Sequence, residues 1–107
     1  MKDSMQNKLN MLQVRLDELN NELSSESATN DMERYKKISK EHSEILPVVD
    51  LYKEFMQLTK DIDDAKEMLS DPEMKTFAQE EIENNKEKII ALEENLQKLL
   101  LPKDPND

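Results

Sequence analysis

Histidine and clustered carboxylates are the side chains of this sequence that could most readily perform catalysis or bind a metal. His42 is the only histidine, and without a second ligand or a nucleophile it is typical of a packed or boundary residue. Asp61, Asp63, Asp64 and Glu67 have the composition of a calcium-binding loop, but the required glycine is missing and the surrounding spacing is helical. We therefore predict no catalytic centre, no metal site and no cofactor.

The absence of glycine and cysteine from the 107 residues restricts the possible chemistry further. Phosphate-binding loops, dinucleotide-binding motifs and nucleophile elbows need glycine for close backbone approach or sharp bends. Without cysteine, neither a disulfide nor a thiolate metal site can form. The sequence thus disfavours most nucleotide enzymes and an enzyme complete within these residues.

The charge balance is acidic, with one local exception. Twenty-five acidic and 15 basic residues give a net charge of -10, which opposes general nucleic-acid binding. Arg34, Lys37 and Lys40 form a positive cluster spaced for one side of a helix. We name these three residues as candidate contacts for a protein or for phosphate groups; a solubilising surface is the alternative.

Hydropathy gives no sign of a membrane protein. No stretch approaches the roughly 20 apolar residues that span a bilayer. Residues 1–8 are polar, unlike the apolar core of a signal peptide. We predict a cytoplasmic protein with no membrane partner.

Apolar residues recur at alternating steps of four and three, the spacing of amphipathic helices. This pattern predicts helices at about 4–24, 31–69 and 72–101, separated by polar residues at 24–30 and by a helix restart at Ser70 or Asp71. The predicted inward stripe of the first helix is Met5, Leu9, Leu12, Leu16, Leu19 and Leu23. The stripe of the second helix is Met32, Tyr35, Ile38, His42, Ile45, Val49 and Tyr52, and a shifted stripe of Phe55, Leu58, Ile62, Ala65 and Leu69 extends it. The stripe of the third helix is Ala78, Ile82, Asn85, Ile89, Leu92, Leu96 and Leu99.

Three positions affect the details of these helices. Asn30 is the predicted N-cap of the second helix, with Glu33 as its capping-box partner. Pro47 either kinks or breaks that helix, and a kink is favoured because the neighbouring residues are not turn formers. Asn85 interrupts the third stripe; it lies either at a solvated rim, the interpretation favoured here, or in the interior, where it would fix the helix register.

Three helices with one apolar stripe each predict an all-α fold, specifically an elongated antiparallel three-helix bundle of coiled-coil type with its long middle helix kinked near Pro47. At about 1.5 Å per residue, that helix would reach roughly 60 Å if straight. A single domain is expected over residues 1–101. Residues 102–107 hold two prolines and small polar residues, which indicate the start of a linker.

Three segments, taken together, resemble the N-terminal domain of the bacterial peptide chain release factor 1 family. They are ERYKKISKEH at 33–42, LSDPEM at 69–74 and LLLPKDPND at 99–107. The third is the most specific, and it favours release factor 1 over the related release factor 2. The resemblance extends over essentially the whole chain in order and spacing.

The resemblance implies a fragment of a translation termination factor whose full-length members recognise the stop codons UAA and UAG on the ribosome and trigger peptidyl-tRNA hydrolysis. The Gly-Gly-Gln and Pro-x-Thr tripeptides of the family are missing here, so catalysis is expected outside this chain. The implied partners are the stalk base of the ribosome, the partner GTPase release factor, and the rest of the same factor beyond the linker at 102–107.

Under this interpretation Arg34, Lys37 and Lys40 are the expected contacts with ribosomal RNA or a partner protein. The alternative is a free-standing coiled-coil adaptor or a homo-oligomer, because the stripes of the first and third helices could pair with another chain.

Overall fold

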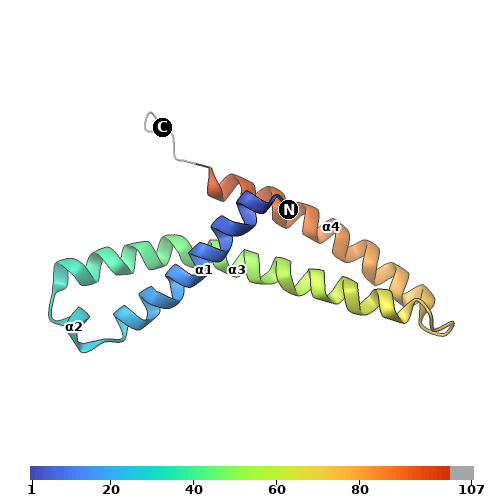
Figure 1. Ribbon diagram of the computed structural model, residues 1–107, viewed down its shortest axis with the longest axis horizontal. Coiled ribbons are helices and arrows are strands. Elements are labelled where there is room, and N and C mark those ends of the chain that lie inside the picture. The colour runs from blue at the N-terminus through green and yellow to red at the C-terminus, as the bar shows by residue number, and fades with distance from the viewer. Residues whose placement is uncertain (102–107) are drawn as a thin grey trace. The chain divides into compact units, whose positions relative to one another are not determined.

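The structure, a computed structural model, describes residues 1–101, and these residues form helices and turns without a strand. The helices are α1 (Asp3–Leu23), α2 (Glu26–Thr29), α3 (Met32–Met68) and α4 (Lys75–Leu100), as Figure 1 shows. The predicted all-α class is therefore confirmed. The linker predicted at 102–107 lies outside the described residues, and a single domain over 1–101 stays a prediction.

The chain divides into two compact units, and α3 contributes one half to each. The first unit, Met1–Asp50, contains α1, α2 and the first part of α3. The second unit begins at Leu51 and contains the rest of α3 together with α4. Each unit has its own cluster of buried apolar side chains.

In the first unit α1 and the beginning of α3 run antiparallel around a core made by their predicted stripes (Figure 1). The four-three spacing places leucines on one side of α1, and burying that side drives the pairing. Buried members of this core are Leu16, Leu19, Ala28, Ile38, Ile45 and Val49, with Leu12, Leu23 and Tyr35 partly buried against them.

The polar stretch between α1 and α3 contains a short helix, α2, where the sequence predicts only a turn. Ala28 explains the difference, because its fully buried side chain belongs to the core of the first unit. The hydroxyl of Thr29 also donates to the carbonyl of Glu26 at 2.8 Å and closes this single helical turn. Burial of one small apolar residue thus adds a fourth helix that hydrophobic periodicity does not reveal.

The N-cap of α3 is Asp31, so the prediction of Asn30 is wrong by one residue. Asp31 accepts a hydrogen bond from the backbone N–H of Arg34 through Oδ1 at 3.1 Å, which is the contact expected of an N-cap. Asn30 instead ends α2, and its own backbone is helical. Glu33 consequently does not occupy the capping-box position.

Pro47 lies inside α3, which continues without interruption from Met32 to Met68. The predicted continuous helix is therefore confirmed, and the alternative of a break is wrong. Residues on both sides of Pro47, such as Ile45 and Val49, are buried in the same core. This packing holds the helix together despite the missing backbone donor of proline.

In the second unit the remainder of α3 pairs with α4 around Ile62, Ala65, Ala78 and Ile82. Asn85 is only 5 % exposed, and among residues 1–101 it is the one polar residue that is buried. The favoured prediction of a solvated rim position is therefore wrong. Asn85 occupies an inward position of the α4 stripe, where a polar side chain can restrict the register of two paired helices.

Helix α4 begins at Lys75 rather than at residue 72. The intervening residues form a turn in which the N–H of Met74 bonds the carbonyl of Asp71 at 3.0 Å. Asp71 also accepts from the backbone N–H of Glu73 through Oδ1 at 3.0 Å. The prediction that Ser70 or Asp71 caps the last helix is therefore wrong, because Met74 precedes α4 and the carboxylate of Asp71 instead stabilises a separate turn before it.

The predicted stripe residues are buried or half-buried, except for two near helix ends. Met32, the first residue of α3, is exposed, and Leu99 near the end of α4 is 50 % exposed. Periodicity places both on the inner face, but a neighbouring helix must also extend that far to cover them.

Among residues 1–101, no helix combines the length and the apolar character needed to cross a membrane.

Candidate functional site

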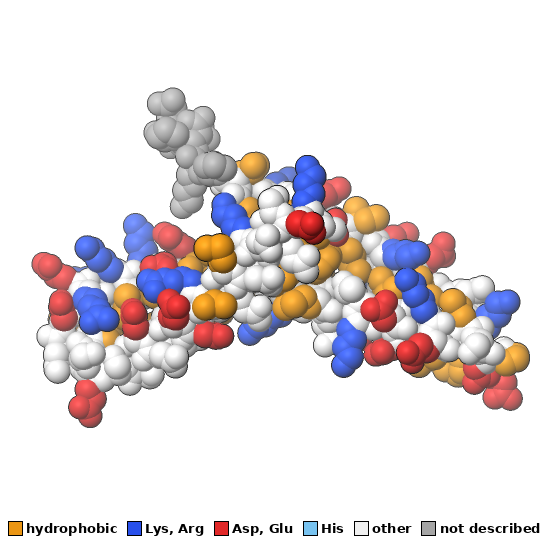
Figure 2. All heavy atoms as spheres, in the orientation of Figure 1, with side chains coloured by type: hydrophobic (Ala, Val, Ile, Leu, Met, Phe, Trp, Pro, Cys, Tyr) orange, Lys and Arg blue, Asp and Glu red, His pale blue; other side chains and the backbone are white. Residues whose placement is uncertain are grey.

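Arg34, Lys37 and Lys40 lie on the first turns of α3, and we call them the basic ridge. All three residues are exposed to solvent. Their spacing of three residues places successive side chains on neighbouring parts of one helix side. In Figure 2, blue cationic side chains interspersed with red carboxylates cover this part of the first unit.

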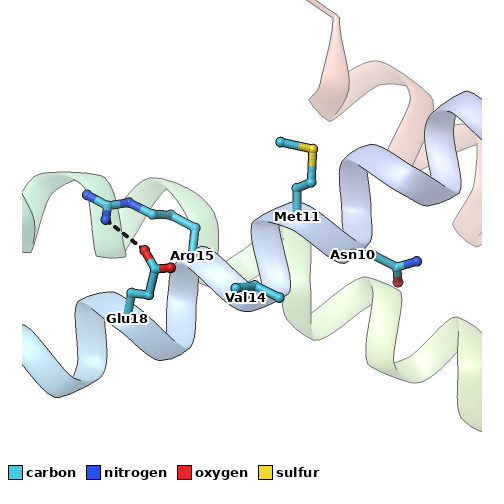
Figure 3. A pocket seen from close by; sticks show the side chains of 5 residues that line it. All are labelled: Asn10, Met11, Val14, Arg15 and Glu18. Atoms are coloured by element: carbon cyan, nitrogen blue, oxygen red, sulfur yellow. Dashed lines mark hydrogen bonds and ion pairs between the residues drawn. The ribbon is translucent and has the colours of Figure 1, made fainter.

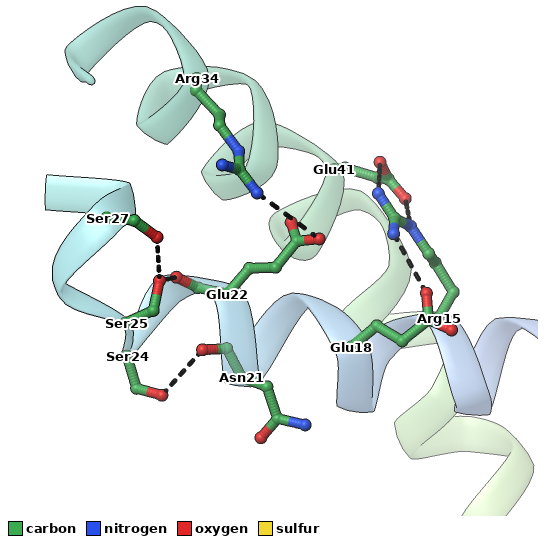
Figure 4. Close-up of polar contacts among 9 residues, drawn as sticks. All are labelled: Arg15, Glu18, Asn21, Glu22, Ser24, Ser25, Ser27, Arg34 and Glu41. Atoms are coloured by element: carbon green, nitrogen blue, oxygen red, sulfur yellow. Dashed lines mark hydrogen bonds and ion pairs between the residues drawn. The ribbon is translucent and has the colours of Figure 1, made fainter. Parts of the chain in front are cut away.

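The arginine of the ridge has a carboxylate nearby on α1. Arg34 Nη2 lies 3.9 Å from Glu22 Oε1, a long and exposed ion pair (Figure 4). Such a pair contributes little to stability, and an incoming phosphate or carboxylate could replace Glu22. Lys37 and Lys40 have no ionic partner within the part of the chain that the structure describes. The ridge can therefore offer positive charge to an anionic partner.

A stronger ionic contact joins α1 to α3 at Glu41, the residue that follows Lys40 of the ridge. Arg15 forms a two-point contact with Glu41, in which Nε donates to Oε2 and Nη2 donates to Oε1 at 2.9 Å. Arg15 Nη1 also donates to Glu18 Oε2 at 3.2 Å (Figure 4). The hydrogen bonds from Arg15 lower the pKa of the Glu41 carboxyl below its usual value, because they stabilise the ionised form.

This shift predicts a pH-dependent contribution to stability. The folded-state pKa of Glu41 is depressed, so its stabilising contribution is complete above the ordinary value of 4.5 and is lost as the pH falls through the lowered pKa. We expect Glu41→Gln to lower the thermal unfolding midpoint by a few degrees at neutral pH, because about a third of each side chain is exposed and solvent weakens the pair. Thermal melts followed by circular dichroism would measure this.

The control for Glu41→Gln is Glu33→Gln, which removes a carboxylate from the same helix but leaves the Arg15 pair intact. The deficit of Glu41→Gln relative to the parent should shrink as the pH falls below 4.5. A deficit that stays constant down to the acid transition would contradict the proposed role of the ion pair.

His42 also connects α3 to α1. One of its ring nitrogens, Nε2, lies 2.8 Å from Asn20 Oδ1, and the residue is half-buried. This confirms the prediction of a boundary histidine. The neutral amide partner provides neither a metal ligand set nor a nucleophile, so the contact fixes the two helices relative to each other.

An open hollow of about 440 Å³ lies on the outer side of α1 (Figure 3). It is lined by Asn10, Met11, Val14, Arg15 and Glu18. Met11 is 72 % exposed and Val14 is 59 % exposed, whereas the polar side chains of Arg15 and Glu18 are bonded to each other. The hollow is therefore a weakly apolar surface without a cluster of convergent polar groups of the kind that binds a small molecule.

Sequence reasoning finds the basic ridge but misses the Arg15–Glu41 pair. These residues are 26 positions apart, so no local spacing rule relates them. The antiparallel arrangement of α1 and α3 brings them together, as it does Glu22 with Arg34 and Asn20 with His42. Predicting such contacts requires the relative register of the two helices.

The fold is an all-α module of paired helices, and the exposed basic ridge gives its first unit a local positively charged surface. Its family is given by a match to the PCRF domain model over residues 12–107. The chain belongs to this PCRF-domain family.

Several curated relatives agree with this assignment. The chain is 50% identical to proteins named peptide chain release factor 1 from Burkholderia multivorans, Paraburkholderia phymatum and Nitrosospira multiformis. Each similarity covers all 107 residues of this chain but only 30% of the relative. No solved structure is significantly similar to the chain. The chain therefore corresponds to less than a third of the relatives that it matches.

Proposed function

We propose that this chain is the N-terminal interaction domain of a translation termination factor. The observation that carries the proposal is the 50% identity, over the full chain, to release factor 1 proteins of several bacteria. The full-length factor would recognise the stop codons UAA and UAG on the ribosome and trigger hydrolysis of peptidyl-tRNA in the cytoplasm.

The catalytic step of this proposed activity belongs to parts of the factor outside this chain. The hydrolysis motif expected from the family resemblance is Gly-Gly-Gln, and this sequence contains no glycine. The chain would therefore help to bind and orient the factor on the ribosome, while the remaining part of the factor performs codon reading and hydrolysis. Rigid paired helices suit this role because they hold surface side chains in fixed relative positions.

The basic ridge is the proposed ribosome contact, at or near the base of the stalk and beside the partner GTPase release factor. Its cations are exposed, and the overall charge of -10 makes this local positive surface an exception. Ribosomal RNA is a dense array of phosphates, and contacts to phosphate position a protein without reading sequence. A guanidinium and two ammonium groups at helical spacing fit such a role.

Reversing the charge of the ridge tests this proposal. We expect Arg34→Glu with Lys37→Glu to weaken binding of the chain to bacterial ribosomes by about tenfold or more at low salt, because two phosphate contacts become repulsions. Co-sedimentation with ribosomes over a salt series, with and without the partner GTPase, would measure the loss. The salt dependence of binding should become shallower in the variant.

The matched control reverses two exposed lysines of α4, Lys86→Glu and Lys88→Glu, which changes the net charge equally in the second unit. If this control weakens ribosome binding as much as the ridge variant, overall charge governs the association and the ridge is not the contact. Unchanged binding of the ridge variant at low salt would also exclude it.

A free-standing adaptor that pairs with a second copy is the competing function. The exposed Met11 and Val14 on α1 favour it, because they are one helical turn apart and could contact another helix. Sedimentation equilibrium of the 107-residue chain distinguishes the two functions. A monomer at all concentrations supports the termination-factor domain, whereas a concentration-dependent dimer favours the adaptor.

A further inference from the structure

The second unit carries an open hollow at the end of the α3–α4 pair. The hollow has a volume of about 410 Å³ and is lined by Leu69, Gln79, Ile82 and Glu83. Leu69 and Ile82 supply its apolar surface, while Gln79 and Glu83 lie one helical turn apart on α4 and supply polar groups. An apolar side chain could enter such a hollow while a cation beside it faces Glu83.

Large apolar side chains remain exposed around the same turn. Met68 ends α3, Met74 precedes α4, and Phe77 lies in the first turn of α4 with 51 % of its surface exposed. Orange apolar side chains are visible around this turn at the right of Figure 2. Methionine side chains are flexible and polarisable, so they adapt to partners of different shape. Together with the residues of the hollow, these side chains form what we call the tip surface.

The tip surface lies in a strongly acidic part of the chain. Between Lys60 and Glu83 the sequence has nine carboxylates and three lysines. This sign is opposite to that of the basic ridge on α3. An apolar surface with an acidic surround attracts cationic, amphipathic partners and repels polyanions.

We propose that the tip surface binds a basic amphipathic helical segment of a partner protein. The apolar face of that segment would cover the exposed methionine and phenylalanine side chains and place a large apolar residue in the hollow. Its lysines or arginines would face Glu83 and the neighbouring carboxylates. This contact is separate from the proposed contact of the ridge, because it uses different residues and requires a partner of opposite charge.

Charge favours a basic helical segment over RNA and over a second copy of this chain as the partner that covers the tip surface. RNA would bring phosphates against the nine carboxylates of this segment, which is unfavourable. A second copy of the chain would bring an equally acidic tip against the first and meet the same repulsion. A cationic helix removes the repulsion and buries the apolar side chains at the same time.

The test uses the 107-residue chain and a synthetic helical peptide of leucine and lysine, about 14 residues long so that it forms four turns. Fluorescence anisotropy would measure affinity, and ¹⁵N-resolved chemical shifts would locate the contact. We expect peptide-induced shifts to concentrate at residues 68–83. Phe77→Glu should weaken binding about tenfold, and Glu83→Lys should weaken it by roughly threefold to tenfold.

Matched controls on the same helix are Ile90→Glu, which replaces a residue that is 59 % exposed, and Glu94→Lys. Both should retain the parent affinity, and a peptide with glutamate in place of lysine should not bind. Shifts located away from residues 68–83, or equal losses in the control variants, would overturn the proposal. So would binding of polyuridine RNA at the tip at the same salt concentration.

Discussion

Leu19→Ala is expected to lower the free energy of unfolding by about 3 kcal/mol, because it removes a large buried side chain from the core of the first unit. Leu19 is fully buried and packs in the cluster that contains Leu16, Ala28 and Ile38. Two paired helices have few other side chains that could move in to fill the cavity. Urea unfolding followed by helical circular dichroism would measure the change.

The matched control for Leu19→Ala is Val14→Ala on the same helix, where the native side chain is largely exposed. This substitution should change stability by no more than about 0.5 kcal/mol. If the two variants lose the same stability, α1 does not bury its leucine stripe against α3, and the assignment of the first core is wrong.

Pro47→Ala is expected to stabilise the chain by about 2 kcal/mol. An interior proline costs a helix about 3 kcal/mol through its missing donor and its clash with the preceding turn. Proline also restricts the conformations of the unfolded chain, so replacing it by alanine stabilises the unfolded state by up to about 1 kcal/mol. The difference leaves a net gain, because α3 continues through this position and Pro47 is exposed. The same urea unfolding experiment would measure it.

Pro72→Ala provides the contrast to Pro47→Ala, because the substitution is chemically identical but its site is the turn before α4. No helical hydrogen bond is gained there, so only the freedom of the unfolded chain increases. We expect a loss of about 0.5 kcal/mol. A gain of equal size at both prolines would contradict the helical explanation for Pro47.

The helices themselves could be predicted from sequence because their signal is local. The leucine stripe of α1 places its ends within one residue of the observed Asp3–Leu23, and the stripe of α3 spans Pro47 correctly. Errors occur where a tertiary contact competes with local preference. Burial of Ala28 creates α2, and the end of α2 then moves the N-cap of α3 from Asn30 to Asp31.

The candidate site was predictable only in part. Arg34, Lys37 and Lys40 are found by charge and helical spacing, and the structure places all three at the surface. Their function as a contact stays a prediction. Two contacts depend on how α1 lies against α3: the ion pair of Glu22 with Arg34 and the hydrogen bonds of Arg15 to Glu41. Local spacing carries no information on that register.

By itself, the sequence determined that the chain is helical and acidic and that it cannot form glycine-dependent binding loops. Composition gives the charge and the missing glycine directly, and the hydrophobic period that predicts helices extends over only a few turns of the backbone. Only the tertiary structure decided which side chains are covered. Asn85 is buried although it is polar, while Leu99 and Phe77 are exposed although they are apolar. The physical reason is that burial requires a second surface at the right position, and that surface comes from residues distant in the chain.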